Sequence, residues 1–187
     1  MPARPDWLEG ELFERRLVFV AGRLETTLAM RAAAELMTLD ASGSDAVDVY
    51  IESSGGTIEA AFTLIDTLDL LVAPTRIHVL GEVGGAALGV LTAGRRRTAA
   101  ANAGFHLAEP VLRVNGTTGQ MLAWGQHQQL LLQRFHERLA QATGKAIGEV
   151  THDLEHGRYL NSAEALDYGL VHEIGDPKVA RHGVRGD

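Results

Sequence analysis

Two segments of the sequence each run from a β-strand pattern into a glycine-rich turn, and they limit the possible folds more than any other feature. Residues 51–56 read Ile-Glu-Ser-Ser-Gly-Gly, and residues 81–89 read Gly-Glu-Val-Gly-Gly-Ala-Ala-Leu-Gly. A helix pattern follows each turn, so backbone N–H groups are directed towards one point, as an oxyanion hole requires. A hydrolase with this frame would carry Ser or Cys at the second turn, where this chain has Gly85.

Composition excludes several classes of function. The chain has 187 residues, no cysteine and a formal net charge of −7. Without cysteine there is no disulfide, thiolate metal site or thiol nucleophile, and the negative charge argues against nucleic-acid binding. The compact basic run at 95–97 is expected to be a solvated turn. No apolar run reaches the ~20 residues that a membrane span needs, and the first residues lack a signal-peptide core. We therefore expect a cytoplasmic protein.

Hydrophobic periodicity predicts an α/β fold. Repeated strand–strand–helix units favour an α/β spiral over a doubly wound sheet. Thr57 is a candidate N-cap, and Thr117 with Gln120 forms a capping box ahead of the longest helix, which Gly144 ends. The predicted strands are 17–20, 47–51, 76–80, 103–107 and 171–174, and the predicted helices are 26–39, 58–70, 86–92, 118–142, 147–156 and 162–168.

The longest helix is predicted to project from the domain. At ~1.5 Å per residue it would span roughly 37 Å, more than one small domain easily covers. Its apolar stripe is also incomplete, so we expect it to pack on another subunit. The stripe comprises Met121, Trp124, Leu131, Phe135 and Leu139.

Taken in order, these motifs resemble the proteolytic subunit of the Clp protease, a serine peptidase family with a crotonase-like fold. Residues 50–57 resemble the family's Tyr-Ile-Asn-Ser-Pro-Gly-Gly-Ser, and residues 81–94 follow its Gly-Gln-Ala-Ala-Ser-Met-Gly-Ala stretch without a gap. Residues 159–171 match its C-terminal third. The resemblance covers about residues 12–175. It implies a short N-terminal segment at 1–14, one Clp-protease-like domain at 15–175 with a handle helix, and a polar tail at 176–187.

The resemblance also implies that the catalytic triad is missing. The family's nucleophilic Ser falls on Gly85, its His on Ala108 and its Asp on Gly157. The amides of Gly56 and Ala86 occupy the positions that would form the oxyanion hole. Loss of a triad in a model serine protease costs on the order of 10⁶ in turnover, and an oxyanion hole alone leaves about 10³ to 10⁴ over water. Peptidase activity is therefore not expected.

The expected function is that of a catalytically degenerate ring subunit, structural or regulatory, with no cofactor. The family resemblance implies self-association into heptameric or stacked double rings, with a Clp-type paralogue as a possible second subunit. The short segment ahead of the first strand departs from the family's axial loop, so docking to an AAA+ unfoldase is not expected to follow. A ring that binds peptides without cleaving them is a further possibility.

Relocated catalytic residues are the alternative. Ser53 or Ser54 could act as a nucleophile with His106 and Glu109, or Glu82 and Glu109 could serve lyase or isomerase chemistry on a thioester, as carboxylates do in the wider crotonase superfamily. We expect instead that His106 is a half-buried strand histidine and that the two carboxylates lie at the surface or between subunits.

A second pattern is typical of zinc hydrolases. Residues 152–156 read His-Asp-Leu-Glu-His, which matches H-x-x-E-H. Zinc would also need a third ligand and a cleft, so we expect His152 and His156 to be exposed and to bind no metal. His127 and His136 on the longest helix are predicted to be interface or solvated residues.

Overall fold

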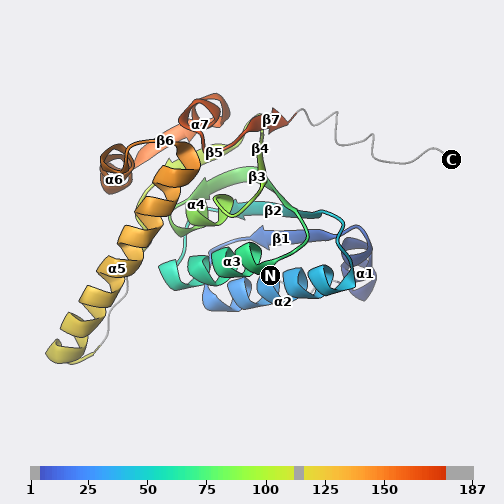
Figure 1. Cartoon of the computed structure of the whole chain (residues 1–187), viewed down its shortest axis with the longest axis horizontal. Coiled ribbons are helices and arrows are strands. Elements are labelled where there is room, and N and C mark those ends of the chain that lie inside the picture. Colours follow the sequence, from blue (N-terminus) through green and yellow to red (C-terminus); the bar gives the residue numbers. More distant parts are fainter. Residues whose placement is uncertain (1–4, 112–115, 176–187) are drawn as a thin grey trace.

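The computed structural model describes residues 5–111 and 116–175, and it is an α/β fold, as predicted. Helices and strands alternate along most of the chain (Figure 1). The strands are β1 (Leu17–Ala21), β2 (Val47–Ser53), β3 (Thr75–Gly84), β4 (Arg96–Ala100), β5 (Gly104–Leu107), β6 (Arg158–Asn161) and β7 (Glu173–Gly175), and the helices are α1 (Asp6–Glu14), α2 (Thr26–Ser42), α3 (Ile58–Leu70), α4 (Ala86–Leu91), α5 (Thr118–Thr143), α6 (Ile147–His156) and α7 (Ser162–Tyr168).

The strands form a single seven-stranded sheet whose main path is β1-β2-β3-β4-β7, all parallel. The long strand β3 has two partners on the same side. Its first part pairs with β4, and its end pairs with β5 through Glu82↔Gly104 and Gly84↔His106. Strand β6 then pairs antiparallel with β5. This change of partner places the ends of β2, β3 and β5 together at one edge of the sheet.

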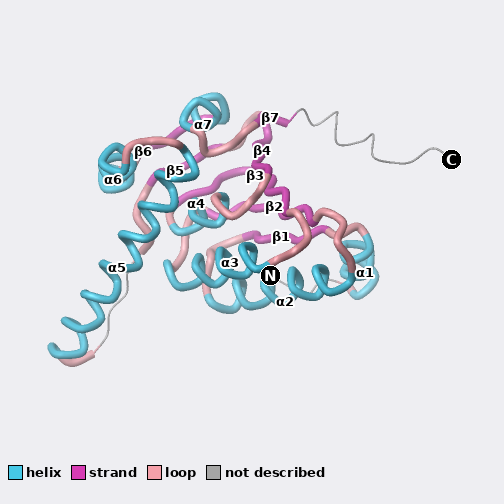
Figure 2. The backbone as a smooth tube through the Cα atoms, viewed as in Figure 1, coloured by secondary structure: helices cyan, strands magenta, loops and turns pink. Residues whose placement is uncertain are grey.

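The hydrophobic core lies between the sheet and helices α2, α3 and α4, which lie together on one side of it in Figure 2. Strand residues alternate across the sheet, so Val18 and Val20 of β1 and Ile77 and Val79 of β3 are completely or almost completely buried. Burying each such side chain contributes roughly 1.5–3 kcal/mol. The opposite face of β2, β3 and β4 remains partly open to solvent.

Helix α5 projects from the rest of the molecule, as the incomplete apolar stripe predicted (Figure 1). The Thr117–Gln120 capping box is present at its start, and Gly144 ends it in the left-handed conformation. Only its C-terminal half joins the core, through Phe135 and Leu139, while Met121 near its start is 47% exposed. Phe135 packs against α4 at Gly89, where a β-carbon would lie 2.5 Å from the ring.

Most elements were predicted from the sequence, and α3, α6 and α7 have the predicted bounds. Elements α1, β4 and β6 were not predicted, and the last strand was predicted to begin two residues and to end one residue too early. The expectation of a solvated turn at 95–97 was wrong for Arg97, although Arg95 and Arg96 are exposed. Arg97 lies in β4, is 6% exposed, and donates to the carbonyls of Ala142 (2.9 Å) and Gly169 (3.1 Å). It thus binds the C-terminal ends of α5 and α7, where carbonyls need donors.

The described residues include no helix that is both long and apolar enough to cross a membrane. The predicted polar tail at 176–187 lies outside the described residues.

Candidate functional site

Two glycine-rich turns meet at the carboxyl edge of the sheet. After β2, the turn at Gly55 and Gly56 is tied to the chain after β1, because Leu24 donates to the carbonyl of Gly55 and Thr57 donates to the carbonyl of Leu24, both at 2.9 Å. The hydrogen bonds between these two segments therefore use the amides of Leu24 and Thr57 and not that of Gly56. Thr57 then caps α3 by accepting from the amide of Ala60, as predicted.

Steric packing requires glycine at position 56. A β-carbon there would lie 2.0 Å from the carbonyl oxygen of Leu24, much closer than two non-bonded atoms can approach. This residue and its neighbour Gly55 are both buried. The backbone of the first turn is therefore fixed by close contact between main-chain atoms.

The second turn carries Gly85, the position predicted to correspond to the nucleophile. Its backbone has φ +48° and ψ −129°, and its amide donates to the carbonyl of His106 at 3.2 Å. A β-carbon here would lie 3.4 Å from the Cα of Gly55 and 4.0 Å from the carbonyl oxygen of Ala108. The site thus has room for a side chain, which would point towards Ala108, the predicted histidine position. Ala86 follows as the first residue of α4, where a helix leaves its amide unpaired.

Gly157, the predicted aspartate position, lies beside His106. A β-carbon on Gly157 would be 3.6 Å from Nε2 of that imidazole. The His106 ring stacks on Tyr159 with centroids 4.0 Å apart and an angle of 4° between the planes. His106 is half-buried on β5, as predicted. The structure therefore brings Gly85 next to Ala108 and Gly157 next to His106.

Ser54 directly follows β2, in the first glycine-rich turn. Together with Ser53 and the carboxylates of Glu52 and Glu82, it lines an open hollow of about 360 Å³. Ser53 is 2% exposed and donates to the carbonyl of Gly55 at 3.1 Å. Within the described residues, no hydrogen bond joins Ser54 to His106 or to any carboxylate.

Glu109 pairs with the longest helix and not with His106. Its Oε1 lies 3.5 Å from Nε2 of His136, whose Nδ1 is 3.1 Å from Oγ1 of Thr151. The prediction that His136 is solvated or at an interface was wrong, because it is 6% exposed and packs inside this chain. Burial lowers the pKa of His136, although the charges of Glu109 and Glu155 act in the opposite direction. His127 on the same helix is exposed.

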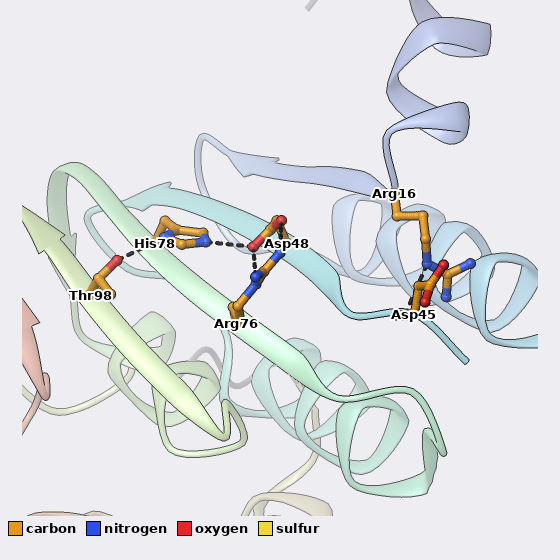
Figure 3. Close-up of polar contacts among 6 residues, drawn as sticks. All are labelled: Arg16, Asp45, Asp48, Arg76, His78 and Thr98. Atoms are coloured by element: carbon orange, nitrogen blue, oxygen red, sulfur yellow. Dashed lines mark hydrogen bonds and ion pairs between the residues drawn. The ribbon is translucent and has the colours of Figure 1, made fainter. Parts of the chain in front are cut away.

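A separate polar network lies on the open face of the sheet (Figure 3). Nε2 of His78 is 2.8 Å from Oδ1 of Asp48, and Nδ1 of the same ring is 2.7 Å from Oγ1 of Thr98. Arg76 donates to both oxygens of Asp48, at 2.7 and 2.6 Å. The ring of Tyr50 stacks on His78 at 4.8 Å. These residues come from adjacent strands, so the β-register alone brings them together.

Hydrogen bonding sets the charge state of this network. Burial disfavours the ionised form of Asp48, but hydrogen bonds from His78 and Arg76 outweigh it and lower the pKa of this carboxyl. Burial, together with the charge of Asp48, raises the pKa of Tyr50. The network therefore contains a carboxyl group with a lower pKa than usual and a phenol with a higher pKa than usual.

The described residues hold no cluster of three or more His, Asp or Glu side chains arranged to bind a metal ion. In the H-x-x-E-H segment, His152 and His156 are exposed, with ring centroids 4.1 Å apart, and Nδ1 of His156 bonds to the carbonyl of His152 at 2.8 Å.

Comparison with known proteins identifies the family. The family model described as Clp protease matches residues 5–178, nearly the whole chain. The chain belongs to the Clp protease family. It is 29% identical to ATP-dependent Clp protease proteolytic subunit 2 of Gluconobacter oxydans over 171 residues, which are 89% of this chain and 77% of that protein. It is also 29% identical to proteolytic subunit 1 of Thermobifida fusca, over 88% of this chain and 76% of the relative. A proteolytic subunit of Paracoccus denitrificans is 28% identical over 86% of this chain and 81% of that protein.

Within this Clp-type fold, the turns at the carboxyl edge were predicted from the sequence, but both histidine networks were not. His78 and Asp48 alternate with apolar residues along their strands, and that period of two was the available signal for a polar sheet face. No comparable signal marked His136, because its partners Glu109 and Thr151 lie far from it in the sequence.

Proposed function

We propose that this member of the Clp protease family is a catalytically degenerate proteolytic-subunit homologue that acts as a structural or regulatory ring subunit. The observation that supports this most strongly is at the carboxyl edge. The backbone of both turns is closely packed, yet Gly85, Ala108 and Gly157 supply no nucleophile, base or carboxylate there. A serine hydroxyl attacks a carbonyl only when a positioned base removes its proton, so these groups act as a unit.

The contacts of the alternative residues support the same proposal. A relocated triad of Ser54, His106 and Glu109 would need its members within hydrogen-bond reach of each other. In this chain Ser54 lines the hollow with Glu82, His106 stacks on Tyr159, and Glu109 faces His136. The amides of Gly56 and Ala86 remain the candidates for binding a carbonyl oxygen without cleaving its bond.

Self-association is supported by the exposed apolar residues of α5. Met121, Leu122 and Leu130 are 47%, 68% and 58% exposed on the projecting part of this helix. Side chains of this kind are covered when a second subunit packs against them. We infer that the ring-forming parts of the Clp-type fold are retained in this chain, alone or together with a triad-bearing paralogue.

The test is native mass spectrometry of the tagged chain purified gently from its host, with peptide hydrolysis measured on the same material. A ring that contains a triad-bearing paralogue, with turnover only from that paralogue, is the expected result. A homogeneous ring without turnover would support the catalytically degenerate role but contradict a mixed ring with a paralogue. A chain that sediments as a monomer at micromolar concentration, or that hydrolyses peptides by itself, would contradict the proposal.

A further inference from the structure

The buried histidine of the longest helix joins three parts of the chain. His136 lies on α5 and is 6% exposed. Its Nδ1 meets Thr151 of α6 at 3.1 Å, and its Nε2 faces Glu109 of the segment after β5 at 3.5 Å. The neighbouring residue Phe135 fixes α5 against α4 at Gly89. The imidazole is therefore held by a rigid helix and faces a segment that lines the candidate site.

One ring nitrogen of His136 has no hydrogen-bond partner among the described residues. Nε2 is fully buried, and the 3.5 Å separation from Glu109 is too long for a hydrogen bond. An unpaired buried nitrogen opposite a carboxylate is unusual, because buried polar groups are nearly always paired. When the neutral ring carries its hydrogen on Nδ1 and donates it to Thr151, adding a second proton gives Nε2 an N–H and the ring a positive charge directed at the carboxylate.

The carboxylate belongs to the segment that contacts Gly85. The carbonyl oxygens of Ala108 and Glu109 lie 4.0 and 3.8 Å from the place where a β-carbon of Gly85 would stand. The Glu109 side chain is 35% exposed, so it has freedom to move towards the ring. A change of about 0.6–0.8 Å from the present 3.5 Å would bring the pair to charge-assisted hydrogen-bond distance.

We propose that protonation of His136 draws Glu109 into a direct ion pair and so fastens residues 108–110, the rim of the candidate site, to helices α5 and α6. The position of this rim then depends on pH. Thr151 accommodates both states, because its hydroxyl accepts from Nδ1–H both in the neutral Nδ1–H tautomer and in the protonated ring. The ionisable groups that act on His136 are Glu109 from the rim segment and Glu155 from α6.

The proton has opposite effects on the rim and on the whole fold. Burial lowers the pKa of His136 in the folded chain, so the unfolded chain takes up this proton first as the pH falls. The stability that neutral His136 contributes is complete above the ordinary histidine pKa. It is lost as the pH falls through the lower pKa that His136 has in the folded chain. Acid therefore fastens the rim while lowering the global free energy of unfolding.

The test uses NMR on the full chain. The His136 ring is titrated, and exchange of the Ala108 and Glu109 amides is followed on both sides of its midpoint, relative to the unstructured rate. We expect protection of these amides to rise at least about threefold when His136 is protonated. In Glu109→Gln the His136 pKa should fall further and the rise in protection should disappear. Glu109 is partly exposed, so this variant is expected to fold.

Glu155→Gln is the matched control, because it removes the other carboxylate without changing the rim. It should lower the His136 pKa but preserve the rise in protection. Protection that does not change across the titration, or a rise that persists in Glu109→Gln, would overturn the proposal, as would a His136 pKa that Glu109→Gln leaves unchanged. No readout depends on catalysis or on ring assembly, so failure here would leave the proposed function untouched.

Discussion

The carboxyl edge of the sheet and its open face each carry part of what acyl-transfer chemistry needs. The edge has closely packed glycine turns and candidate donors at Gly56 and Ala86, but no linked nucleophile and base. The open face has a hydroxyl, an imidazole and a carboxylate in hydrogen-bonded sequence, in Thr98, His78 and Asp48. There, however, the amides around Thr98 lie in a strand with partners on both sides, so they cannot bind an oxyanion.

The comparison of the two surfaces shows that neither of them alone has everything that acyl-transfer catalysis requires. A hydroxyl–imidazole–carboxylate arrangement without free donors lacks the electrostatic stabilisation that is usually the largest catalytic contribution. Donors without a triad lack the base that makes the hydroxyl nucleophilic. In this chain the two halves lie on different surfaces, and the network of the open face is bound to Arg76, which makes it a structural ion pair.

The largest expected effect tests the packing of the edge. Gly56→Ala places a β-carbon 2.0 Å from the Leu24 carbonyl oxygen. We expect a loss of at least ~3 kcal/mol in the free energy of unfolding, because main-chain atoms must move. Urea denaturation measures it. Gly104→Ala is the matched control, since a β-carbon there meets nothing within 4 Å and should be neutral or stabilising by up to ~1 kcal/mol. Equal stability of the two variants would show that the edge is not rigid.

The next effect tests whether the edge can still support catalysis. A triple variant with Gly85→Ser, Ala108→His and Gly157→Asp restores the three side chains. If the amides are still aligned, activated-ester hydrolysis should rise by about 10²-fold over wild type, equivalent to ~2.7 kcal/mol of barrier. The positive φ of Gly85 should cost the serine ~1–2 kcal/mol of stability.

Two controls sharpen this rebuilding experiment. The same background with Gly85→Ala lacks only the nucleophile and should show no gain. A version that adds His106→Gln removes the imidazole that lies 3.6 Å from the Gly157 β-carbon position and could capture the new aspartate. A folded triple variant without any gain in either version would show that the backbone donors are misaligned.

A smaller effect is expected on the open face. Asp48→Asn removes the ionised acceptor of Arg76 and His78, and we expect a loss of ~1–2 kcal/mol for this partly buried group. Because the folded-state pKa is lowered, the wild-type contribution is complete above about pH 4 and is lost as the pH falls through the folded value. Stability measured from pH 5 downward should therefore fall less steeply in Asp48→Asn.

Asp45→Asn is the control for that measurement. Asp45 is exposed, and it is its backbone carbonyl that accepts from Arg16, at 3.0 Å, so the substitution leaves this bond in place (Figure 3). Its acid profile should match that of wild type. Matching profiles for Asp48→Asn and wild type would show that the network contributes nothing measurable.

The smallest expected effect is at the edge itself. Ser54→Ala should change stability by less than about 0.5 kcal/mol and leave activity at the wild-type background, because Ser54 is exposed and unconnected to a base. Ester hydrolysis and urea denaturation measure the two quantities. A measurable wild-type activity that disappears in Ser54→Ala would instead favour the relocated nucleophile.

Most of the fold followed from local patterns in the sequence. Capping residues such as Thr57, Thr117 and Gly144 act on their own helices, so their roles could be predicted without tertiary information. Strand β4 could not be predicted, because it begins within the run of three arginines at 95–97, which resembles a solvated turn. Arg97 is buried only because the ends of α5 and α7 bring carbonyls to it.

The candidate site likewise has some features that local sequence predicts and others that depend on tertiary packing. The glycine turns were visible in the sequence, since Gly55, Gly56 and Gly85 lie next to strand patterns. The contact between Glu109 and His136 joins residues that are distant in the sequence, and it depends on how α5 packs against the sheet. Neither hydrophobic periodicity nor the family resemblance contains that information.

The most direct test of the central claim is reaction of the purified chain with a fluorophosphonate, which phosphonylates activated serines with loss of fluoride, followed by intact-mass measurement. A triad-bearing Clp proteolytic subunit serves as the positive control. The account predicts that this chain remains at its unmodified mass under conditions that label the control completely. A stoichiometric adduct, mapped to Ser53, Ser54 or any other hydroxyl, would contradict it and establish that this chain has a working nucleophile.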